Sequence, residues 1–413
     1  MSVDIQIRRA GVEEFPAVAE LDGASFGFHY SEQELADAAL DIDPARIMVA
    51  ADGAWGSPDG QGRDRGGRIV AVSAEVPLQL AVPGGDLRVM GITWVSVEIT
   101  HRRRGILRAL IEHQLRAHAE QGYAATVLGA SEAGIYGRFG FGVASSVRRT
   151  SIDRLRGHLA VPVDAGAVRR LSTDRARDVL PELYERWRAT TPGALGRDER
   201  RWQFLLLDRE YQRRGASGLF HLVHPDGYVS YRIKPDWGDG DPRHECQLVD
   251  YVPVTAEAHA ALWQTLLGMD LVGTITSYAV PLDDPLPHLL TDPRRVETLH
   301  IGDGMWVRPL DVAALLGGRS YPLEVEVVLQ VTDPLLGDGR YLLRGGPDGA
   351  TCTRTERVAD IELGVGALGA ICLGGTRLAT LARAGRAGGS PDALRRLELA
   401  LLTDRAPFHG THI

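Results

Sequence analysis

The chain has 413 residues, of which 44% are apolar and 24% charged, and its formal net charge is −8 at pH 7. This length predicts two or three domains, each with its own hydrophobic core. The negative charge argues against a general nucleic-acid-binding protein. No apolar run reaches the ~18 residues that a membrane span needs, and the first residues lack the pattern of a signal peptide. We therefore expect no membrane span.

Three cysteines, Cys246, Cys352 and Cys372, stand far apart in the chain. An odd number at such spacing predicts small buried apolar side chains rather than a disulfide framework or a metal site. We expect no bound metal, and a reducing cytoplasm is the simplest compartment for such a protein.

The first 150 residues alternate between strand and helix patterns. Alternation and apolar runs predict strands at residues 3–8, 46–50, 69–80 and 87–97. A helical pattern runs from Val12 to Phe26, and Ser31 followed by Glu34 is typical of a capping box at the start of a second helix. The residues between Gly53 and Gly67 predict an exposed loop.

The stretch from Val95 to Leu107 reads VSVEITHRRRGIL, an apolar run that breaks into a basic turn before an amphipathic helix. The N-terminus of such a helix offers free N–H groups and the positive end of the helix dipole, which favour a phosphate. Gly105 allows the backbone to approach an anion closely, and the arginines add charge and forked donors. A solvated surface loop is the alternative interpretation.

The spacing Arg102-x-x-Gly105 resembles the pyrophosphate loop of GNAT acetyltransferases, Q/R-x-x-G-x-G/A, from which Leu107 departs. A buried strand is expected at residues 123–131, and the sequence YGRFGF from Tyr136 to Phe141 then matches the Y-x-x-x-G-F element of that superfamily. The runs HRRRGILR and ASEAGIYGRFGFG resemble, more specifically, the Eis acetyltransferases of actinobacteria.

A second cycle of similar elements follows residue 150. Helices are expected at residues 176–190 and 256–267, and strands at residues 169–171, 220–223, 227–233, 246–254 and 271–278. The segment around Val254 has the same order as the segment around the basic turn: a strand, a short break, a helix and a second strand. Thr255 to His259 replace the arginines and the glycine, so the copy lacks a phosphate loop. We expect an internal repeat with one acetyl-CoA site per chain.

The proline-broken segment at residues 281–287 leads to a third region. Strands are expected at residues 304–308, 323–331, 339–344, 350–354 and 359–363, and helices after Pro309 and at residues 365–373 and 377–384. The resemblance implies a sterol-carrier-protein-like domain here. The expected fold class is α/β and α+β, with a GNAT domain at 1–150, a degenerate GNAT-like domain at 151–290 and the third domain at 291–413.

The resemblance also implies how acetyl-CoA binds. The backbone of Val95, Ser96 and Val97 would pair with the pantetheine arm, although a plain core strand is the alternative. The pyrophosphate would lie on Arg103, Arg104, Gly105, Ile106, Leu107 and Arg108. Ser131 and Glu132 would line the far wall.

Two groups carry the catalytic roles in this interpretation. A phenol with a pKa near 10 can protonate a leaving thiolate, and the resemblance gives that role to Tyr136, whose alternative is simple packing. The resemblance assigns the general base to the terminal carboxylate, which here belongs to Ile413 where the family often has phenylalanine. A frayed tail is the alternative.

Three other residues are rival bases or pocket residues. Glu98 follows the strand that leads into the basic turn, where a solvated loop glutamate is the alternative. His101 has a suitable pKa but is expected to face solvent. His29 belongs to an aromatic segment expected to line the acceptor pocket.

The resulting hypothesis is an acetyl-CoA-dependent N-acetyltransferase of cationic amines, with aminoglycosides and broad regiospecificity suggested by the resemblance. One alternative is a lysine acetyltransferase acting on proteins or peptides, and another is a non-catalytic protein that binds CoA or a lipid. The resemblance further implies a homohexamer built as a trimer of dimers.

Overall fold

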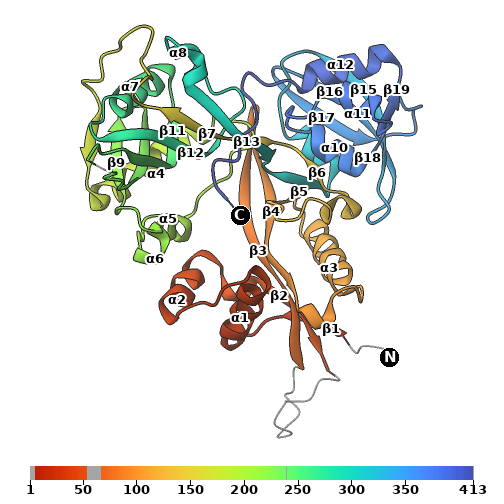
Figure 1. The fold of residues 1–413 in the computed structure, drawn as a ribbon. Helices are drawn as coiled ribbons and strands as arrows, with labels where there is room; N and C mark the ends of the chain where they lie inside the picture. The colour runs from red at the N-terminus through yellow and green to blue at the C-terminus, as the bar shows by residue number, and fades with distance from the viewer. Residues whose placement is uncertain (1–4, 54–66, 239, 413) are drawn as a thin grey trace, which may run out of the picture.

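The computed structural model describes residues 5–53, 67–238 and 240–412, whose strands form two seven-stranded sheets and one five-stranded sheet. In Figure 1 the first sheet rises from the bottom to the centre, the second lies at the upper left and the third at the upper right. The loop predicted between Gly53 and Gly67 falls on residues 54–66, which lie outside the described residues.

The first sheet has the strand order β1-β2-β3-β4-β5-β14-β6. Its strands are β1 (Ile5–Arg9), β2 (Ile47–Asp52), β3 (Arg68–Val82), β4 (Gly85–Val97), β5 (Ala125–Leu128), β6 (Gly142–Val143) and β14 (Trp306–Pro309). Its helices and 3₁₀ turns are η1 (Val12–Glu14), α1 (Phe15–Phe26), α2 (Glu32–Asp41), η2 (Pro44–Arg46), η3 (Ile99–His101), α3 (Ile106–Glu120) and η4 (Tyr136–Phe139).

Alternation along β2 places the helices on opposite faces of this sheet. Ile47 and Val49 pack with α1 and α2, whereas Met48 and Ala50 pack with α3. The predicted capping box opens α2: the N–H of Glu34 donates to Ser31 Oγ over 3.2 Å, and the N–H of Ser31 donates to the Glu34 carboxylate over 2.8 Å.

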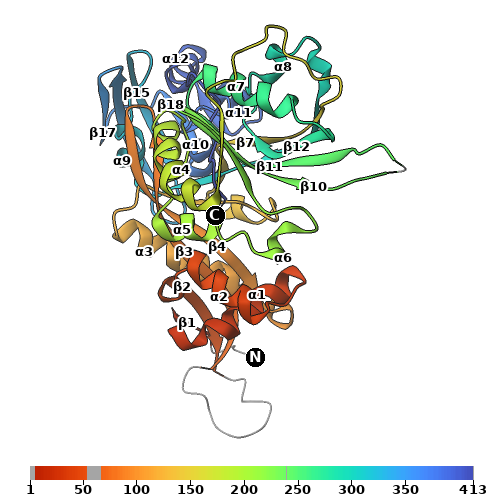
Figure 2. The same cartoon turned by 90° about the vertical axis from the view of Figure 1, so that its left-hand side faces the viewer.

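The second sheet has the order β13-β7-β12-β11-β10-β9-β8. Its strands are β7 (Ser146–Asp153), β8 (Arg169–Leu171), β9 (Phe220–His224), β10 (Gly227–Lys234), β11 (His244–Pro253), β12 (Val272–Val280) and β13 (Val296–Asp303). Its helices are α4 (Thr173–Arg188), α5 (Glu199–Leu205), α6 (Glu210–Arg213), α7 (Ala256–Leu267), α8 (Leu286–Leu289) and η5 (Pro293–Arg295). The β10–β11 hairpin projects from the body (Figure 2).

The internal repeat is present in the structure. In the first sheet α3 connects β4 to its parallel neighbour β5, and in the second sheet α7 connects β11 to its parallel neighbour β12. In each sheet two antiparallel strands precede this unit, β2–β3 and β9–β10. The order predicted from sequence is therefore correct for both copies.

One strand of the first sheet comes from a distant part of the chain. β14 pairs with β5 through Trp306 and Leu128 and with β6 through Trp306 and Val143. The sequence predicts this strand correctly but gives no reason to place it in the first sheet. Because β13, immediately before it, pairs with β7 in the second sheet, the chain links both sheets within a few residues.

The third sheet, in the order β17-β16-β15-β18-β19, has its own core of aliphatic side chains. Its elements are α9 (Val312–Gly317), β15 (Val325–Thr332), β16 (Gly339–Gly346), β17 (Gly349–Arg354), β18 (Ile361–Gly364), α10 (Val365–Ile371), α11 (Leu378–Arg383), β19 (Ala387–Gly389) and α12 (Pro391–Leu401). All three cysteines are buried, as expected. Across the described ranges, every helix is too short or too polar to cross a membrane.

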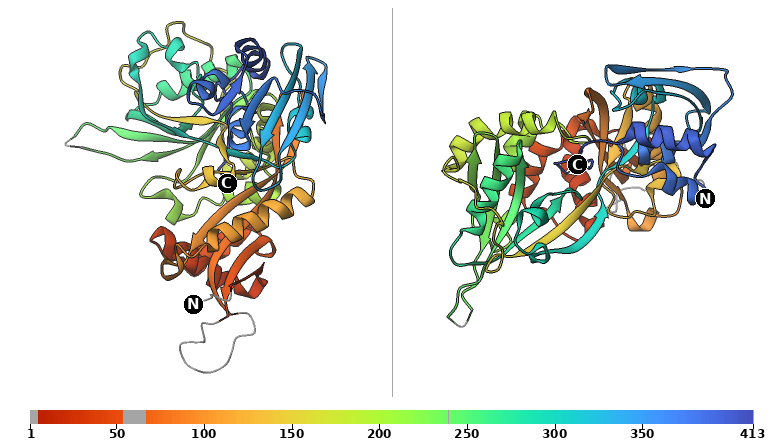
Figure 3. Two further views of the ribbon diagram at one scale, coloured as in Figure 1. Left: turned by 90° about the vertical axis from the view of Figure 1, so that its right-hand side faces the viewer. Right: turned by 90° about the horizontal axis from the view of Figure 1, so that it is seen from above.

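The chain leaves the third region after α12 and returns to the centre of the molecule. In Figure 1 the C-terminal end lies between the second region and the long β3–β4 hairpin, and both views of Figure 3 show it near the middle of the molecule. The last described residues therefore lie between the first and second regions.

Candidate active site

The first sheet opens between β4 and β5. The two strands pair only from Val89 to Gly91, which lies opposite Val127. Beyond that point β4 keeps its partner β3 but has no pairing with β5 up to Val97. The open edge of a strand can accept an added strand or an amide-bearing chain. Val95, Ser96 and Val97, the predicted pantetheine-binding residues, lie in this open segment.

A bulge lies within the opening. Opposite β3, pairing passes from Ser96 directly to Thr93, so β4 carries an extra residue at this place. Trp94 has a φ of 51°, in the left-handed region that a bulky residue rarely adopts. Its ring lies 5.9 Å from that of Phe15 and 5.8 Å from that of Tyr30, and these contacts hold it in place.

The basic turn follows the open strand and leads into α3. Gly105 has a φ of 80° and precedes the helix, and, its chain neighbours aside, no atom of the described residues lies within 4 Å of the position where a Cβ would stand. Arg103 and Arg104 are exposed beside it. The first N–H groups of α3 therefore face an open, basic surface, which fits a diphosphate.

Leu107, the departure from the superfamily pattern, does not block this surface. Its side chain is partly buried and packs with the cluster that contains Tyr136 and Phe139. Ile106 is buried against Ala50 and Val70 on the sheet. Arg108 is exposed on the next position of the helix. The predicted cradle thus has its apolar residues inside and its cations outside.

Tyr136 lies in η4, beyond the end of β5. Its side chain is 7% exposed, and its ring meets the edge of Phe141 at 5.8 Å. Burial, with a smaller effect from the negative charge of Glu132, raises the pKa of Tyr136 to about 12. The phenol is therefore protonated at neutral pH, as a general acid must be. Ser131 and Glu132 are exposed just before it.

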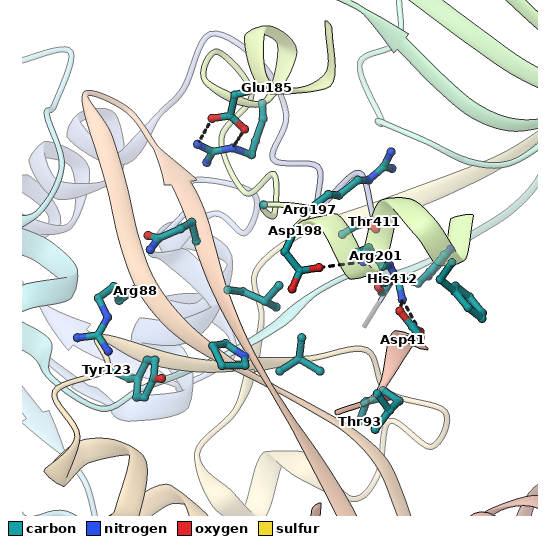
Figure 4. Close-up of a pocket in the computed structure, with 18 of the residues that line it drawn as sticks. Asp41, Arg88, Thr93, Tyr123, Glu185, Arg197, Asp198, Arg201, Thr411 and His412 are labelled. Atoms are coloured by element: carbon teal, nitrogen blue, oxygen red, sulfur yellow. Dashed lines mark hydrogen bonds and ion pairs between the residues drawn. The ribbon is translucent and has the colours of Figure 1, made fainter. Parts of the chain in front are cut away.

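A cavity of about 620 Å³ lies between the first and second regions (Figure 4). Trp94, Asp41, Asp198 and Glu185 are among its lining residues, together with Thr411 and His412 from the tail. Arg201 forms an ion pair with Asp41, and Arg188 forms one with Glu185 at 2.5 Å. Asp198 is exposed and caps α5 by accepting the N–H of Arg201 over 2.8 Å.

The rival bases have structural partners. His101 is fully buried, so the expectation that it faces solvent is wrong: its Nε2 lies 3.2 Å from Asp52 and its Nδ1 lies 2.8 Å from the hydroxyl of Thr100. Glu98 caps η3 and lies 3.6 Å from Arg68. His29 is exposed at the end of the segment that follows α1.

The tail is bound by the second region. The N–H of Phe408 donates to the carbonyl of Pro192 over 2.9 Å, and the N–H of Leu195 donates to the carbonyl of His409 over 3.0 Å. His409 and His412 also line a cavity of about 310 Å³ that contains Ser131. Ile413, the predicted base, lies outside the described residues.

Sequence reasoning missed the residues that connect these parts. Trp94, Asp41, Arg197 and Arg201 come from three separate segments and belong to no short motif. Trp94 lines the large cavity and has an unusual φ. A sequence does not show such a backbone angle.

The residues and geometry correspond to known families over nearly the whole chain. Models described as acetyltransferase (GNAT) domains match residues 6–144 and 193–309, and a sterol carrier protein domain model matches residues 312–410. The protein is thus a GNAT acetyltransferase with two GNAT domains and a sterol-carrier-like domain. The open edge of β4, which leads into the glycine-capped N-terminus of α3, lies in the first of the two GNAT domains.

Relatives give a more specific assignment. The chain is 39% identical to the N-acetyltransferase Eis of Mycobacterium bovis over 369 residues, which are 87% of this chain and 89% of the relative. It is 38% identical, with the same coverage, to the protein of that name from Mycobacterium tuberculosis. The crystal structure of Eis1 from Mycobacterium abscessus superposes with a TM-score of 0.84 at 32% identity, covering 99% of this chain and 100% of that one. The chain belongs to the Eis family of N-acetyltransferases.

Proposed function

We propose that this protein transfers the acetyl group of acetyl-CoA directly to an amine, and that aminoglycosides are acceptors. The observation that carries this proposal is the open edge of β4, which continues into the N-terminus of α3. A pantetheine arm has amide groups that an open strand can pair with, and a diphosphate has the charge that the helix N-terminus and Arg103 and Arg104 favour.

The chemistry requires an attack and two proton movements. The nitrogen of a neutral amine attacks the thioester carbonyl carbon, the carbon–sulfur bond breaks, and the departing thiolate takes the phenolic proton of Tyr136. The proton of the amine goes to a base. The high pKa of Tyr136 keeps that proton available, and its place beyond β5 supports its role.

The base in this proposal is the terminal carboxylate of Ile413. The support lies in the residues before it: His412 lines the large cavity beside Trp94 and also the smaller cavity beside Ser131. The resemblance to the Eis family supplies the remainder of the argument.

The acceptor would occupy the 620 Å³ cavity, which has room for an aminosugar. Asp198 offers an exposed carboxylate to a cation, whereas Asp41 and Glu185 already have arginine partners. A peptide lysine is the second candidate acceptor. The hexamer implied by the resemblance is part of the same proposal and is measured by light scattering on the purified protein.

Thiol release from acetyl-CoA tests the proposed function. We expect turnover with kanamycin or tobramycin well above that with a lysine peptide or without acceptor. Extending the chain by two residues beyond Ile413 should lower kcat by about 100-fold, whereas Ile413→Phe keeps a terminal carboxylate and should remain active. Equal turnover of the extended chain rejects the base, and release without any acceptor dependence rejects the transferase.

A further inference from the structure

The second GNAT domain has an opening that corresponds to the one in the first. β11 and β12 pair in parallel only as far as Leu248, opposite Ser277. Beyond that point both strands line a cavity of about 440 Å³, and α4, α5, α6 and β10 also contribute to its wall. Residues 408–412 of the tail are also part of this wall. The chain's own tail therefore lies at the opening of the degenerate copy.

The N-terminus of α7 has a side-chain cap, whereas α3 begins after a glycine. Thr255 occupies the cap position, and its hydroxyl accepts the N–H of Ala258 over 3.2 Å. A side chain of the protein thus satisfies a group that a phosphate would otherwise bind. The second copy has kept the opening between its strands and lost the anion site.

Arg197 connects this opening to the tail. Its side chain is 3% exposed and forms a two-point ion pair with Asp250 of β11, at 2.6 and 3.2 Å. Its guanidinium lies 3.8 Å from the centre of the Tyr184 ring. The same guanidinium donates to the carbonyl of Gly410 over 2.7 Å. Burial alone would lower the pKa of Arg197, but the charge and hydrogen bonds of Asp250, together with Tyr184 and Tyr228, outweigh it and the pKa is raised, so the cation persists.

Gly410 allows the tail to turn at this contact. Its φ is 68°, and a Cβ there would stand 2.6 Å from the ring of Trp187. Any other residue would meet both a strained backbone and an immovable aromatic ring. His412 follows Gly410 by two residues, and its carbonyl accepts a hydrogen bond from Arg201. Arg201 also forms an ion pair with Asp41 of the first domain.

We propose that the degenerate GNAT domain serves as the binding site for the C-terminal tail, and that Arg197 is a positioning residue for catalysis. The tail fixed in this way forms part of the wall of two cavities next to the first domain, through Thr411 and His412 in one and through His409 and His412 in the other. The catalytic consequence rests on the proposed function, in which the residue after His412 provides the base.

Two variants and a control test this. Gly410→Ala brings a Cβ against Trp187, and Arg197→Met removes the bond to Gly410 while keeping length. Gly385→Ala is the matched control, because Gly385 has a φ of 70° but no atom within 4 Å of its Cβ position. We expect amide hydrogen exchange in the tail peptide, which contains Phe408, to rise at least about tenfold in both variants and to stay unchanged in the control.

In the Gly410→Ala and Arg197→Met variants we expect kcat to fall while the KM for acetyl-CoA hardly changes. A tail displaced by about 1 Å or more should lower kcat by roughly 100-fold, while the KM for acetyl-CoA stays within about twofold. Arg197→Lys keeps the charge without the fork and should recover part of the loss. Because Gly410→Ala leaves the ion pair between Arg197 and Asp250 intact, its variant should fold even if Arg197→Met does not.

The docking site, the positioning role of Arg197 and the proposed base are each tested by a different result. Unchanged tail exchange in Gly410→Ala overturns the docking site. Released tails with normal kcat overturn the positioning role of Arg197. A chain extended beyond Ile413 that turns over normally, with its tail still protected from exchange, rejects the proposed base and leaves the docking site standing.

Discussion

Replacing Tyr136 by phenylalanine tests the proposed acid with little disturbance to the fold. The ring, 7% exposed and packed against Phe141, can stay where it is. Among the residues that the structure describes, the hydroxyl has no hydrogen-bond partner to lose. We therefore expect the free energy of unfolding to change by less than about 1 kcal/mol.

The effect on catalysis should be much larger than the effect on stability. Loss of a general acid typically lowers a rate by about 10² to 10⁴, which corresponds to roughly 3–5 kcal/mol in the activation free energy. The KM for acetyl-CoA should hardly change, because the phenol acts on the thiolate that forms as the bond breaks. Since the pKa of Tyr136 is about 12, loss of its proton should not lower the wild-type rate near neutral pH.

The measurement is steady-state thiol release with a saturating aminoglycoside, together with urea unfolding. Tyr231→Phe is the matched control: Tyr231 is also 7% exposed and its pKa is also raised to about 12 by burial, but it lies in the second sheet. A loss in kcat below about tenfold in Tyr136→Phe, or an equal loss in the control, would refute the reasoning.

Two further changes probe the cofactor loop and a buried ion pair. Gly105→Val adds about 1–2 kcal/mol of backbone strain at a φ of 80°. Because the new side chain would stand where the diphosphate approaches, the KM for acetyl-CoA should rise at least about tenfold. An unchanged KM would mean that the diphosphate binds elsewhere. Burial raises the pKa of Glu75, but hydrogen bonding and charge from His118, with the charge of Arg9, outweigh it and lower the pKa from 4.5 to about 2. Its contribution to stability, on the order of 3 kcal/mol, is therefore complete above about pH 4.5 and lost as the pH falls toward 2. Glu75→Gln should flatten that part of the stability–pH curve, and parallel curves for both proteins would contradict this.

The geometry of the basic turn was predictable because it is local. Val95 to Leu107 are consecutive, so a strand, a turn with Gly105 and the first turn of α3 bring the open backbone, the cations and the helix N-terminus together without help from distant residues. The capping box at Ser31 and the repeat of strand, helix and parallel strand are local in the same sense. For such features the backbone geometry of neighbouring residues decides the structure.

Side-chain environment within the loop was less predictable. His101 stands among arginines in sequence, which favours solvent exposure, but the fold turns its ring inward toward Asp52, 49 residues away. Leu107 departs from the superfamily pattern, and only the packing around Tyr136 shows that its side chain lies away from the open surface of the loop. Burial depends on what the rest of the chain brings to each side of a segment.

The sequence by itself determined the two GNAT copies, the basic turn before α3 and the absence of such a turn before α7. Only the tertiary structure decided that β14 completes the first sheet and that the tail returns to the second domain. Arg197 and Gly410 are 213 residues apart, and their contact depends on how two sheets and the third domain are assembled. Such contacts are made by buried charges and packed rings from separate segments, and no local pattern of residues encodes them.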